Sequence, residues 1–247
     1  MLQIKKLTKI YKGGKKAVSD LNLTVEAGDI YGFIGHNGAG KTTTIKCIVG
    51  IHDFDEGEIL VDHMSVKANP LQCKSVMAYI PDNPDLYEYL TGIQYLNFIA
   101  DIYHVSAEER EKRIREEADA FEITAALGDL ISSYSHGMKQ KLAIISALVH
   151  EPKLLILDEA TGNFDPEFRE KFWKILKEFI SDGKRSVILA THFSQCISST
   201  LITVILYASY SNSFIFSLID FSAFTILSFL FYSIFPRSHL PSFHVGD

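Results

Sequence analysis

The chain has little of what marks secreted, disulfide-bonded or nucleic-acid-binding proteins. Its three cysteines, Cys47, Cys73 and Cys196, show no paired spacing, which favours reduced thiols and an intracellular setting. The formal net charge of −6 lacks the basic surplus of a nucleic-acid-binding surface, so we expect no nucleic-acid partner. No long apolar run follows the charges of Met1–Lys6, so the N-terminus predicts no secretory signal.

One motif stands out against these absences. Gly35–Thr42 reads G-H-N-G-A-G-K-T and matches the phosphate-binding P-loop pattern G-x-x-x-x-G-K-[ST]. A predicted strand, Ile30–Ile34, precedes it, and a predicted helix over 42–50 follows it. Glycines let backbone N–H groups turn onto phosphate oxygens, and the helix N-terminus favours the same negative charge. Because Lys41 and Thr42 suit phosphate and Mg²⁺, the motif predicts a nucleoside triphosphate bound with Mg²⁺.

Two more apolar runs end in polar side chains. The predicted strand Lys153–Glu159 ends in Asp158 and Glu159, and the predicted strand Ser186–His192 ends in His192. Ligands bind outside the carboxyl ends of parallel strands, so we expect these side chains beside the P-loop. There Asp158 would hold Mg²⁺, Glu159 would orient or deprotonate an attacking water, and His192 would approach the γ-phosphate.

The segment Tyr134–Gln140 discriminates among P-loop families. It reads Y-S-H-G-M-K-Q and resembles the L-S-G-G-Q signature of ATP-binding cassette (ABC) ATPases, keeping Ser135 and Gly137 but departing at three other positions. Together with the order of the other motifs, the resemblance spans residues 2–192 and looks most like the ATPase subunits of bacterial ABC exporters of the multidrug or antimicrobial-peptide type. It implies an α/β fold: a P-loop NTPase core of RecA-like mixed sheet, an antiparallel N-terminal β portion and a helical insert carrying the signature.

The resemblance also implies roles for individual residues. Tyr11 would stack on adenine, although a strand aromatic in the core is the alternative. Asp165 would lie in a loop that crosses a dimer interface, and it also precedes Pro166 as a helix N-cap. Asp82 replaces the family's glutamine, so a carboxylate there would meet Mg²⁺ or water while adding negative charge. The implied catalytic residues are Lys41, Glu159 and His192, and the implied metal ligands are Thr42, Asp82 and Asp158. The implied nucleotide-binding residues are Tyr11, Gly35, His36, Asn37, Gly38, Ala39, Gly40, Lys41, Thr42, Thr43, Asp82, Ser135, Gly137, Asp158 and Asp165.

Two kinds of partner follow from the resemblance. Two ATPase subunits would pair head to tail with ATP between them, so that Ser135 and the Gly137 N–H of one meet the γ-phosphate held by the other. A membrane permease would bind the pair, placing the chain peripherally on the cytoplasmic face of the membrane. ATP hydrolysis would then power transport, with export expected. The alternatives are a soluble ABC ATPase that acts on ribosomes or DNA, and an inactive, truncated remnant with a membrane-associating tail.

The middle of the chain, about 87–135, reads as the helical insert. Capping boxes at Thr91 and Ser106 predict helices through Tyr103 and Ala120. Alternating charges over Glu108–Glu117 predict i,i+4 ion pairs on a solvated face. The apolar positions on the first of these helices are interpreted as core rather than as a binding surface: Tyr95, Phe98, Ile99 and Ile102.

After the predicted ATPase domain (1–192) the composition changes abruptly. Residues 193–247 contain no lysine and are dominated by Ser, Phe and Ile. Three interpretations compete: a membrane segment over Thr200–Ile219, an altered reading frame, and an unusual folded lobe. The family pattern of an acidic helix and a strand pair is not recognisable there.

Overall fold

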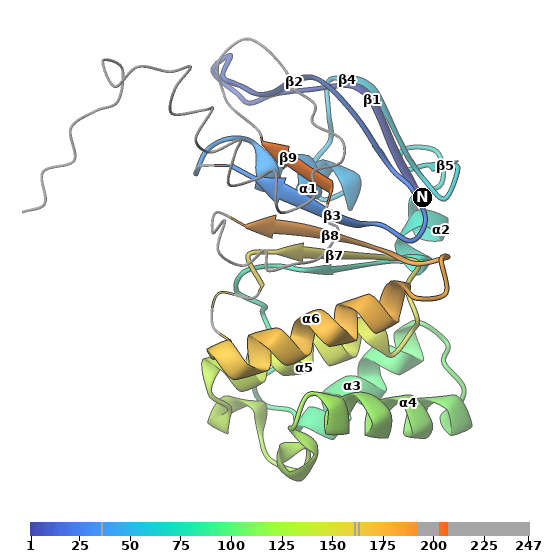
Figure 1. Cartoon of the computed structure of the whole chain (residues 1–247), viewed down its shortest axis with the longest axis vertical. Helices are drawn as coiled ribbons and strands as arrows, with labels where there is room; N and C mark the ends of the chain where they lie inside the picture. Colours follow the sequence, from blue (N-terminus) through green and yellow to red (C-terminus); the bar gives the residue numbers. More distant parts are fainter. Residues whose placement is uncertain (36, 161, 163, 192–202, 207–247) are drawn as a thin grey trace, which may run out of the picture.

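The computed structural model describes residues 1–35, 37–160, 162, 164–191 and 203–206. The elements form layers (Figure 1): an antiparallel sheet, the helix that follows the P-loop, a parallel sheet, and then four helices on the far side of that sheet. This arrangement is the α/β fold with a separate antiparallel portion that the sequence predicts.

The central parallel sheet carries the P-loop and the two carboxylates. Its strand order is β6-β7-β8-β3-β9, and every neighbouring pair runs parallel. The bounds are β3 (Ile30–Ile34), β6 (Met77–Ile80), β7 (Leu154–Asp158), β8 (Ser186–Thr191) and β9 (Thr203–Leu206). The antiparallel strands form a sheet of their own, so the two strand directions are divided between two sheets.

Side-chain alternation explains why the parallel strands are almost wholly apolar. In β7, Leu155 and Leu157 join the core that faces the outer helices, whereas Leu154 and Ile156 join the core shared with the antiparallel sheet. Successive side chains of a strand point to opposite faces, and both faces of this sheet are covered. The predicted strand Ile30–Ile34 is therefore confirmed to the residue, and the predicted strand Ser186–His192 is confirmed over its described residues. The strand predicted at Lys153–Glu159 is present but one residue shorter at each end.

The antiparallel sheet has the order β2-β1-β4-β5. Its strands are β1 (Leu2–Ile10), β2 (Lys16–Val25), β4 (Glu56–Val61) and β5 (Met64–Ser65). Helices α1 (Lys41–Ile48) and α2 (Pro70–Ser75) accompany it, and α1 starts one residue before the predicted helix and ends two before it. Ile45 and Ile48 of α1 are fully buried between the two sheets, so the helix leaving the P-loop is anchored on both sides.

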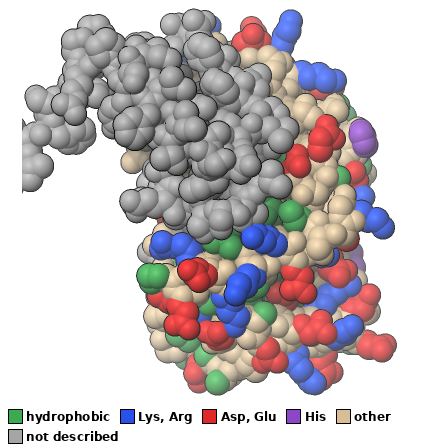
Figure 2. All heavy atoms as spheres, viewed as in Figure 1, with side chains coloured by type: hydrophobic (Ala, Val, Ile, Leu, Met, Phe, Trp, Pro, Cys, Tyr) green, Lys and Arg blue, Asp and Glu red, His purple; other side chains and the backbone are tan. Residues whose placement is uncertain are grey.

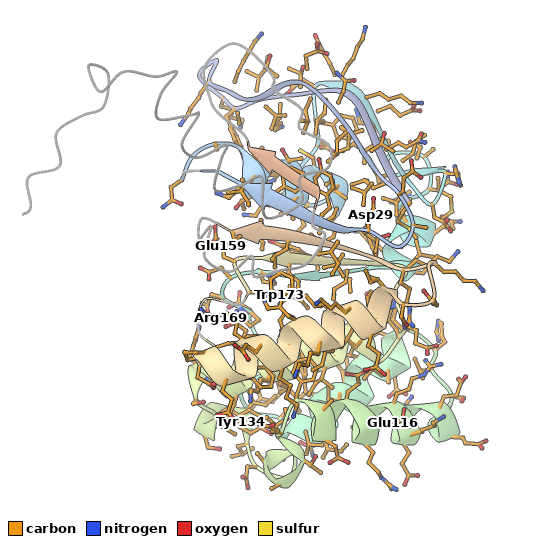
Figure 3. The ribbon with its side chains drawn as sticks, viewed as in Figure 1. Asp29, Glu116, Tyr134, Glu159, Arg169 and Trp173 are labelled. Carbon is orange, nitrogen blue, oxygen red and sulfur yellow. The ribbon has the colours of Figure 1, made fainter. Side chains whose placement is uncertain are left out.

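Helices α5 (His136–Leu148) and α6 (Pro166–Ile180) cover the other face of the parallel sheet, with α3 (Gly92–Ile102) and α4 (Ala107–Ala120) beyond them (Figure 1). Trp173 of α6 lies between that helix and the sheet (Figure 3) and is 8% exposed. Asp165 caps α6 as predicted, with its carboxylate accepting the Phe168 N–H at 2.8 Å and Pro166 as the first helical residue. Gly183, at φ 68, closes the helix by donating to the Ile180 carbonyl.

The two helices of the insert begin at the predicted caps. Thr91 caps α3 with both bonds of the capping box. Ser106 caps α4 by accepting the Glu109 N–H, but the Glu109 carboxylate accepts the Ser106 hydroxyl, so the second bond of the predicted capping box is not the one that forms. Three i,i+4 ion pairs line α4: Glu109–Arg113, Glu111–Arg115 and Lys112–Glu116. Short 3₁₀ turns at Thr124–Ala126 and Ile131–Ser133 lead from α4 to the signature. Figure 2 shows acidic and basic side chains interspersed over this part of the visible surface.

The interpretation of the α3 apolar face as core is half wrong. Tyr95 is buried and Ile99 packs against the core, but Phe98 is 41% and Ile102 is 54% exposed. The apolar stripe is wider than the surface that α5 covers, so its outer edge faces solvent. None of the helices in the described ranges is both long and apolar enough to span a membrane.

Of the predicted tail, only Thr203–Leu206 falls within the described residues. These four residues form β9, which pairs in parallel with β3 in the register Tyr31–Thr203 to Ile34–Leu206. The remainder of 193–247 lies outside the described residues, so the three interpretations of the tail stay predictions. The strand itself is missing from the expectations, because a threonine and three apolar residues inside a longer Ser- and Phe-rich run give no boundary signal.

Candidate nucleotide site

The P-loop leaves β3 and enters α1 through a turn that needs glycine. Gly40, immediately before α1, has φ 96, and a Cβ there would lie 2.5 Å from the Ala17 carbonyl oxygen. Gly38 has φ 83 with open space around it, so its conformation rather than crowding calls for glycine. Ala39 is buried, and Gly35 and Asn37 lie on either side of His36 in this loop. His36 itself falls outside the described residues.

Lys41 lies within the cradle instead of extending to solvent. It is 6% exposed, and its Nζ donates to the Gly35 carbonyl at 2.6 Å. The same Nζ is 3.9 Å from Glu159 Oε1. The ammonium therefore stands between the loop backbone and the carboxylate that follows β7, where a polyphosphate would meet it.

Asp158 and Thr42 lie side by side although 116 positions separate them in the sequence. The Thr42 hydroxyl donates to Asp158 Oδ1 at 3.3 Å, because β7 and β3 both end at this edge of the sheet. Asp158 is 3% exposed, and burial raises the pKa of its carboxyl group, which Thr42 and Lys41 oppose. Burying a carboxylate is costly unless a positive charge compensates it. An all-oxygen donor set around a buried carboxylate suits Mg²⁺.

Glu159 has an unusual backbone. Its φ is 59, and its N–H donates to the Ala190 carbonyl of β8 at 2.9 Å. A non-glycine residue in the left-handed region is uncommon and marks a turn that is held by its surroundings. The Glu159 side chain (labelled in Figure 3) is 18% exposed, and its Oε1 lies 3.9 Å from the Lys41 ammonium. Two adjacent carboxylates thus have separate surroundings, one buried and one partly open.

Tyr11 is exposed and lies beside α1. It follows β1, is 38% exposed, and its hydroxyl is 3.2 Å from the Thr43 hydroxyl. Its ring meets the His52 ring edge to face at 6.0 Å between centroids. The alternative that Tyr11 packs in the core is wrong, because a residue just past the end of the strand has left the sheet.

The remaining predicted residues lie at element ends. Ser135 caps α5 by accepting the Met138 N–H at 3.2 Å, with Gly137 in the first turn behind it. Asp165 caps α6. Asp82 follows β6, is exposed, and its charge contributes to the raised pKa of Asp158. His192 falls outside the described residues, so its place relative to the phosphates stays a prediction.

The structure adds a residue that sequence reasoning missed. The Tyr79 hydroxyl of β6 donates to Asp158 Oδ2 at 3.5 Å, and burial followed by the Asp158 charge raises the pKa of Tyr79 to about 12. Tyr79 lies three residues before Asp82 in the sequence. Only the observed neighbourhood of β6 and β7 identifies it, because sequence order gives no strand order.

Comparisons with known proteins identify the family of this chain. The family model for ABC transporters matches residues 18–162. An uncharacterized ABC transporter ATP-binding protein of Bacillus subtilis, YhcH, is 34% identical over 192 residues, which is 78% of this chain and 62% of the relative. The linearmycin resistance ATP-binding protein LnrL of the same organism is 33% identical over 79% of this chain and 62% of its own length.

A solved structure of the ATP-binding subunit of an ABC transporter superimposes with a TM-score of 0.75 at 31% identity, covering 82% of this chain and 85% of that one. The chain spans less than two thirds of the length of the curated relatives above. The matched family region contains the P-loop, the signature segment and the two carboxylates at the end of β7. The chain therefore belongs to the ABC transporter ATP-binding family.

Proposed function

We propose that this chain binds and hydrolyses ATP as the nucleotide-binding subunit of an ABC transporter and thereby powers transport, in the export direction, through a membrane permease. The observation that carries the proposal is the convergence of Lys41, Thr42, Asp158 and Glu159 at one edge of the sheet. Family membership supports the reaction class, and the relative named for linearmycin resistance supports export. The chain's place is then peripheral, on the cytoplasmic face of the membrane.

Each side chain has a distinct task in this proposal. P-loop N–H groups and Lys41 hold the phosphates, with Thr43 and Tyr11 toward the base. Thr42 and Asp158, with Asp82 nearby, would hold Mg²⁺, which neutralises phosphate charge when bound. Glu159, partly open and turned toward Lys41, orients the attacking water and takes its proton. Phosphoryl transfer is mainly positioning and electrostatics, so each group contributes by where it is held.

The proposal includes head-to-tail pairing of two ATPase subunits. The exposed N-termini of α5 and α6, capped by Ser135 and Asp165, support it. A helix N-terminus presents N–H groups and positive potential to an anion. The Gly137 N–H and Ser135 of one subunit would contact the γ-phosphate bound to the partner's P-loop. His192 would approach the γ-phosphate bound to the P-loop of its own subunit. ATP then joins the two subunits, and hydrolysis removes that link.

An exposed aromatic cluster (Tyr87, Tyr89 and Phe98) supports permease docking on the insert. These side chains are 45%, 75% and 41% exposed. Tyr87 packs 5.9 Å from Tyr89 and 5.6 Å from Phe98 between ring centroids, so the rings form one surface. Clustered aromatics with polar tips are typical of protein interfaces. The permease is the partner that the family relationship supplies.

The decisive test of the reaction is Glu159→Gln. The substitution removes the base but keeps the size, so ATP affinity should persist while steady-state phosphate release falls by about 10² or more. ATP should also shift this variant toward dimer, measured by sedimentation. Undiminished hydrolysis would refute the role of Glu159.

Lys41→Ala provides the complementary test. It removes the buried ammonium from the cradle, so the dissociation constant for ATP should rise by about 10². A matched control is Lys74→Ala, exposed in the last turn of α2, which should change ATP affinity little. An unchanged dissociation constant in Lys41→Ala would mean that this loop is not the phosphate site.

A further inference from the structure

A buried phenylalanine, Phe168, connects α6, the helix that follows Asp165, to α5, the helix that carries the signature. Lys141 of α5 places its Nζ 3.6 Å from the centroid of the Phe168 ring, in α6. Phe168 is 3% exposed. Lys141 lies less than two helical turns beyond Ser135, the cap of α5. The contact therefore joins the first half of α5 to the first turn of α6.

Phe168 also holds the cap of its own helix. Its backbone N–H donates to Asp165 Oδ1 at 2.8 Å. The Phe164 ring, just before the cap, packs edge to face on the Phe168 ring at 4.9 Å between centroids. The Arg169 guanidinium donates to the Phe164 carbonyl at 3.0 Å. One residue thus anchors the Asp165 loop through its backbone and α5 through its ring.

The charge surroundings keep Lys141 at this position. Burial lowers the pKa of Lys141, whereas the Glu122 and Asp165 carboxylates raise it and Lys171 lowers it. Glu122 is itself ion-paired with Lys171 of α6. A partly desolvated ammonium over an aromatic face replaces lost water with the negative potential of the ring. Removing the charge would leave the Phe168 ring without a contact that fixes α5 relative to α6.

We propose that Lys141 and Phe168 are positioning residues that hold Ser135 and Asp165 in one fixed arrangement, so that both reach the neighbouring subunit together. This inference rests on the proposed function, because it assigns the pair to ATP-dependent dimerisation. Neither side chain touches nucleotide. Their loss should weaken pairing and spare ATP binding by the monomer, since α1, the helix that follows the P-loop, packs on the opposite face of the sheet from α5 and α6.

The test uses the full chain with Glu159→Gln as parent, and adds Lys141→Met, Lys141→Arg or, as control, Lys174→Met on the exposed face of α6. Methionine keeps the apolar length of the side chain, and arginine keeps the cation. ATP affinity is measured on dilute monomer, and pairing by sedimentation at saturating Mg-ATP. Hydrogen exchange of the Phe168 amide in the nucleotide-free monomer reports the cap directly.

Lys141→Met should weaken ATP-dependent pairing by about tenfold and change monomer ATP affinity by less than about twofold. It should also speed exchange at the Phe168 amide, whereas Lys141→Arg and Lys174→Met should match the parent. Unchanged pairing with unchanged exchange in Lys141→Met, or an arginine variant that behaves like the methionine one, would overturn the inference. If the parent itself does not pair, the dimer proposal fails, and the Phe168 exchange rate alone decides whether Lys141 holds the cap.

Discussion

At the scale of single residues, the site depends on what surrounds the Asp158 carboxylate. One oxygen accepts from Thr42 and the other from Tyr79. A second contact on a metal-ligating carboxylate fixes its orientation, and losing such a contact typically costs metal affinity. Among the described residues outside the P-loop, Tyr79 is therefore the one whose hydroxyl bonds to the carboxylate that is proposed to hold Mg²⁺.

Tyr79→Phe should raise the Mg²⁺ concentration that gives half-maximal ATPase activity by up to about tenfold. The bond is long, at 3.5 Å, so the low end of this range is expected. Tyr31→Phe is the matched control, because the buried Tyr31 hydroxyl has no hydrogen-bond partner among the described residues. The control should leave the Mg²⁺ requirement unchanged and raise the free energy of unfolding by about 1 kcal/mol. Equal Mg²⁺ curves for both variants would contradict the role of Tyr79.

Residues inside contiguous motifs could be predicted, and residues joined only by strand order could not. Gly40, Lys41 and Thr42 follow from one pattern whose chemistry fixes their roles. Asp158 and Glu159 follow from an apolar run that ends in charge. Tyr79 gives no such signal, because its partner is remote in sequence and only the adjacency of β6 and β7 brings them together.

At the scale of elements, the start of α3 fits against the residue before the signature. A Cβ on Gly92 would lie 2.3 Å from the Tyr134 hydroxyl. Tyr134 is 5% exposed, and its hydroxyl donates to the Ala126 carbonyl at 2.5 Å. The Gly92 N–H and the Ile93 N–H bond to the Asp129 and Leu127 carbonyls. The departure from the signature's leucine at Tyr134 is thus matched by a glycine in another element.

Gly92→Ala should destabilise the chain by about 2 kcal/mol, since the Cβ must displace the Tyr134 hydroxyl. Adding Tyr134→Phe removes that oxygen and should recover part of the loss, so the two substitutions should not be additive in urea unfolding. Gly128→Ala in the same insert is the control, because nothing lies within 4 Å of its Cβ position. Additive effects in the double variant would contradict this contact.

Caps and helix spans in the insert could be read from the sequence, whereas contacts between elements could not. The helix starts at Thr91 and Ser106 are predictable because N-cap hydrogen bonds join residues that are close in the sequence. The exposure of Phe98 and Ile102 depends instead on how much of α3 the helix α5 covers. The Lys141–Phe168 and Gly92–Tyr134 contacts likewise need the packed structure.

At the scale of the whole molecule, two half-buried titratable groups, His150 and Glu117, lie where the insert meets the core. His150, after α5, stacks on Tyr103 at 3.7 Å between ring centroids, and burial, with the Arg113 charge adding to it, lowers its pKa to about 4. Glu117 of α4 is half-buried, and its loss of water, followed by the charges of Glu116 and Glu178, raises its pKa to about 7 against the opposing effect of Arg185. Both groups are therefore neutral in the folded state at mildly acidic pH.

The two groups drive stability in opposite directions. Between about pH 4 and 6.5 the unfolded His150 binds a proton that the folded one does not, so its contribution to stability rises with pH. Between about pH 4.5 and 7 the folded Glu117 keeps a proton that the unfolded one has lost, so its contribution falls as pH rises. Each slope is at most about 1.4 kcal/mol per pH unit, so in the wild type they largely cancel where the windows overlap.

Each of two single substitutions should remove one of these pH dependences of the free energy of unfolding. In urea unfolding across pH 4.5–7, Glu117→Gln should gain stability relative to wild type as pH rises, because the wild type alone must ionise a carboxyl group whose pKa the fold raises. His150→Phe keeps a stacking ring and should lose stability relative to wild type over the same rise. Glu111→Gln, exposed on α4, should run parallel to wild type. If the stability of Glu117→Gln and of His150→Phe also changes with pH as that of the wild type does, neither group is held neutral where the insert meets the core. The packing there is then looser than the contacts of His150 and Glu117 require.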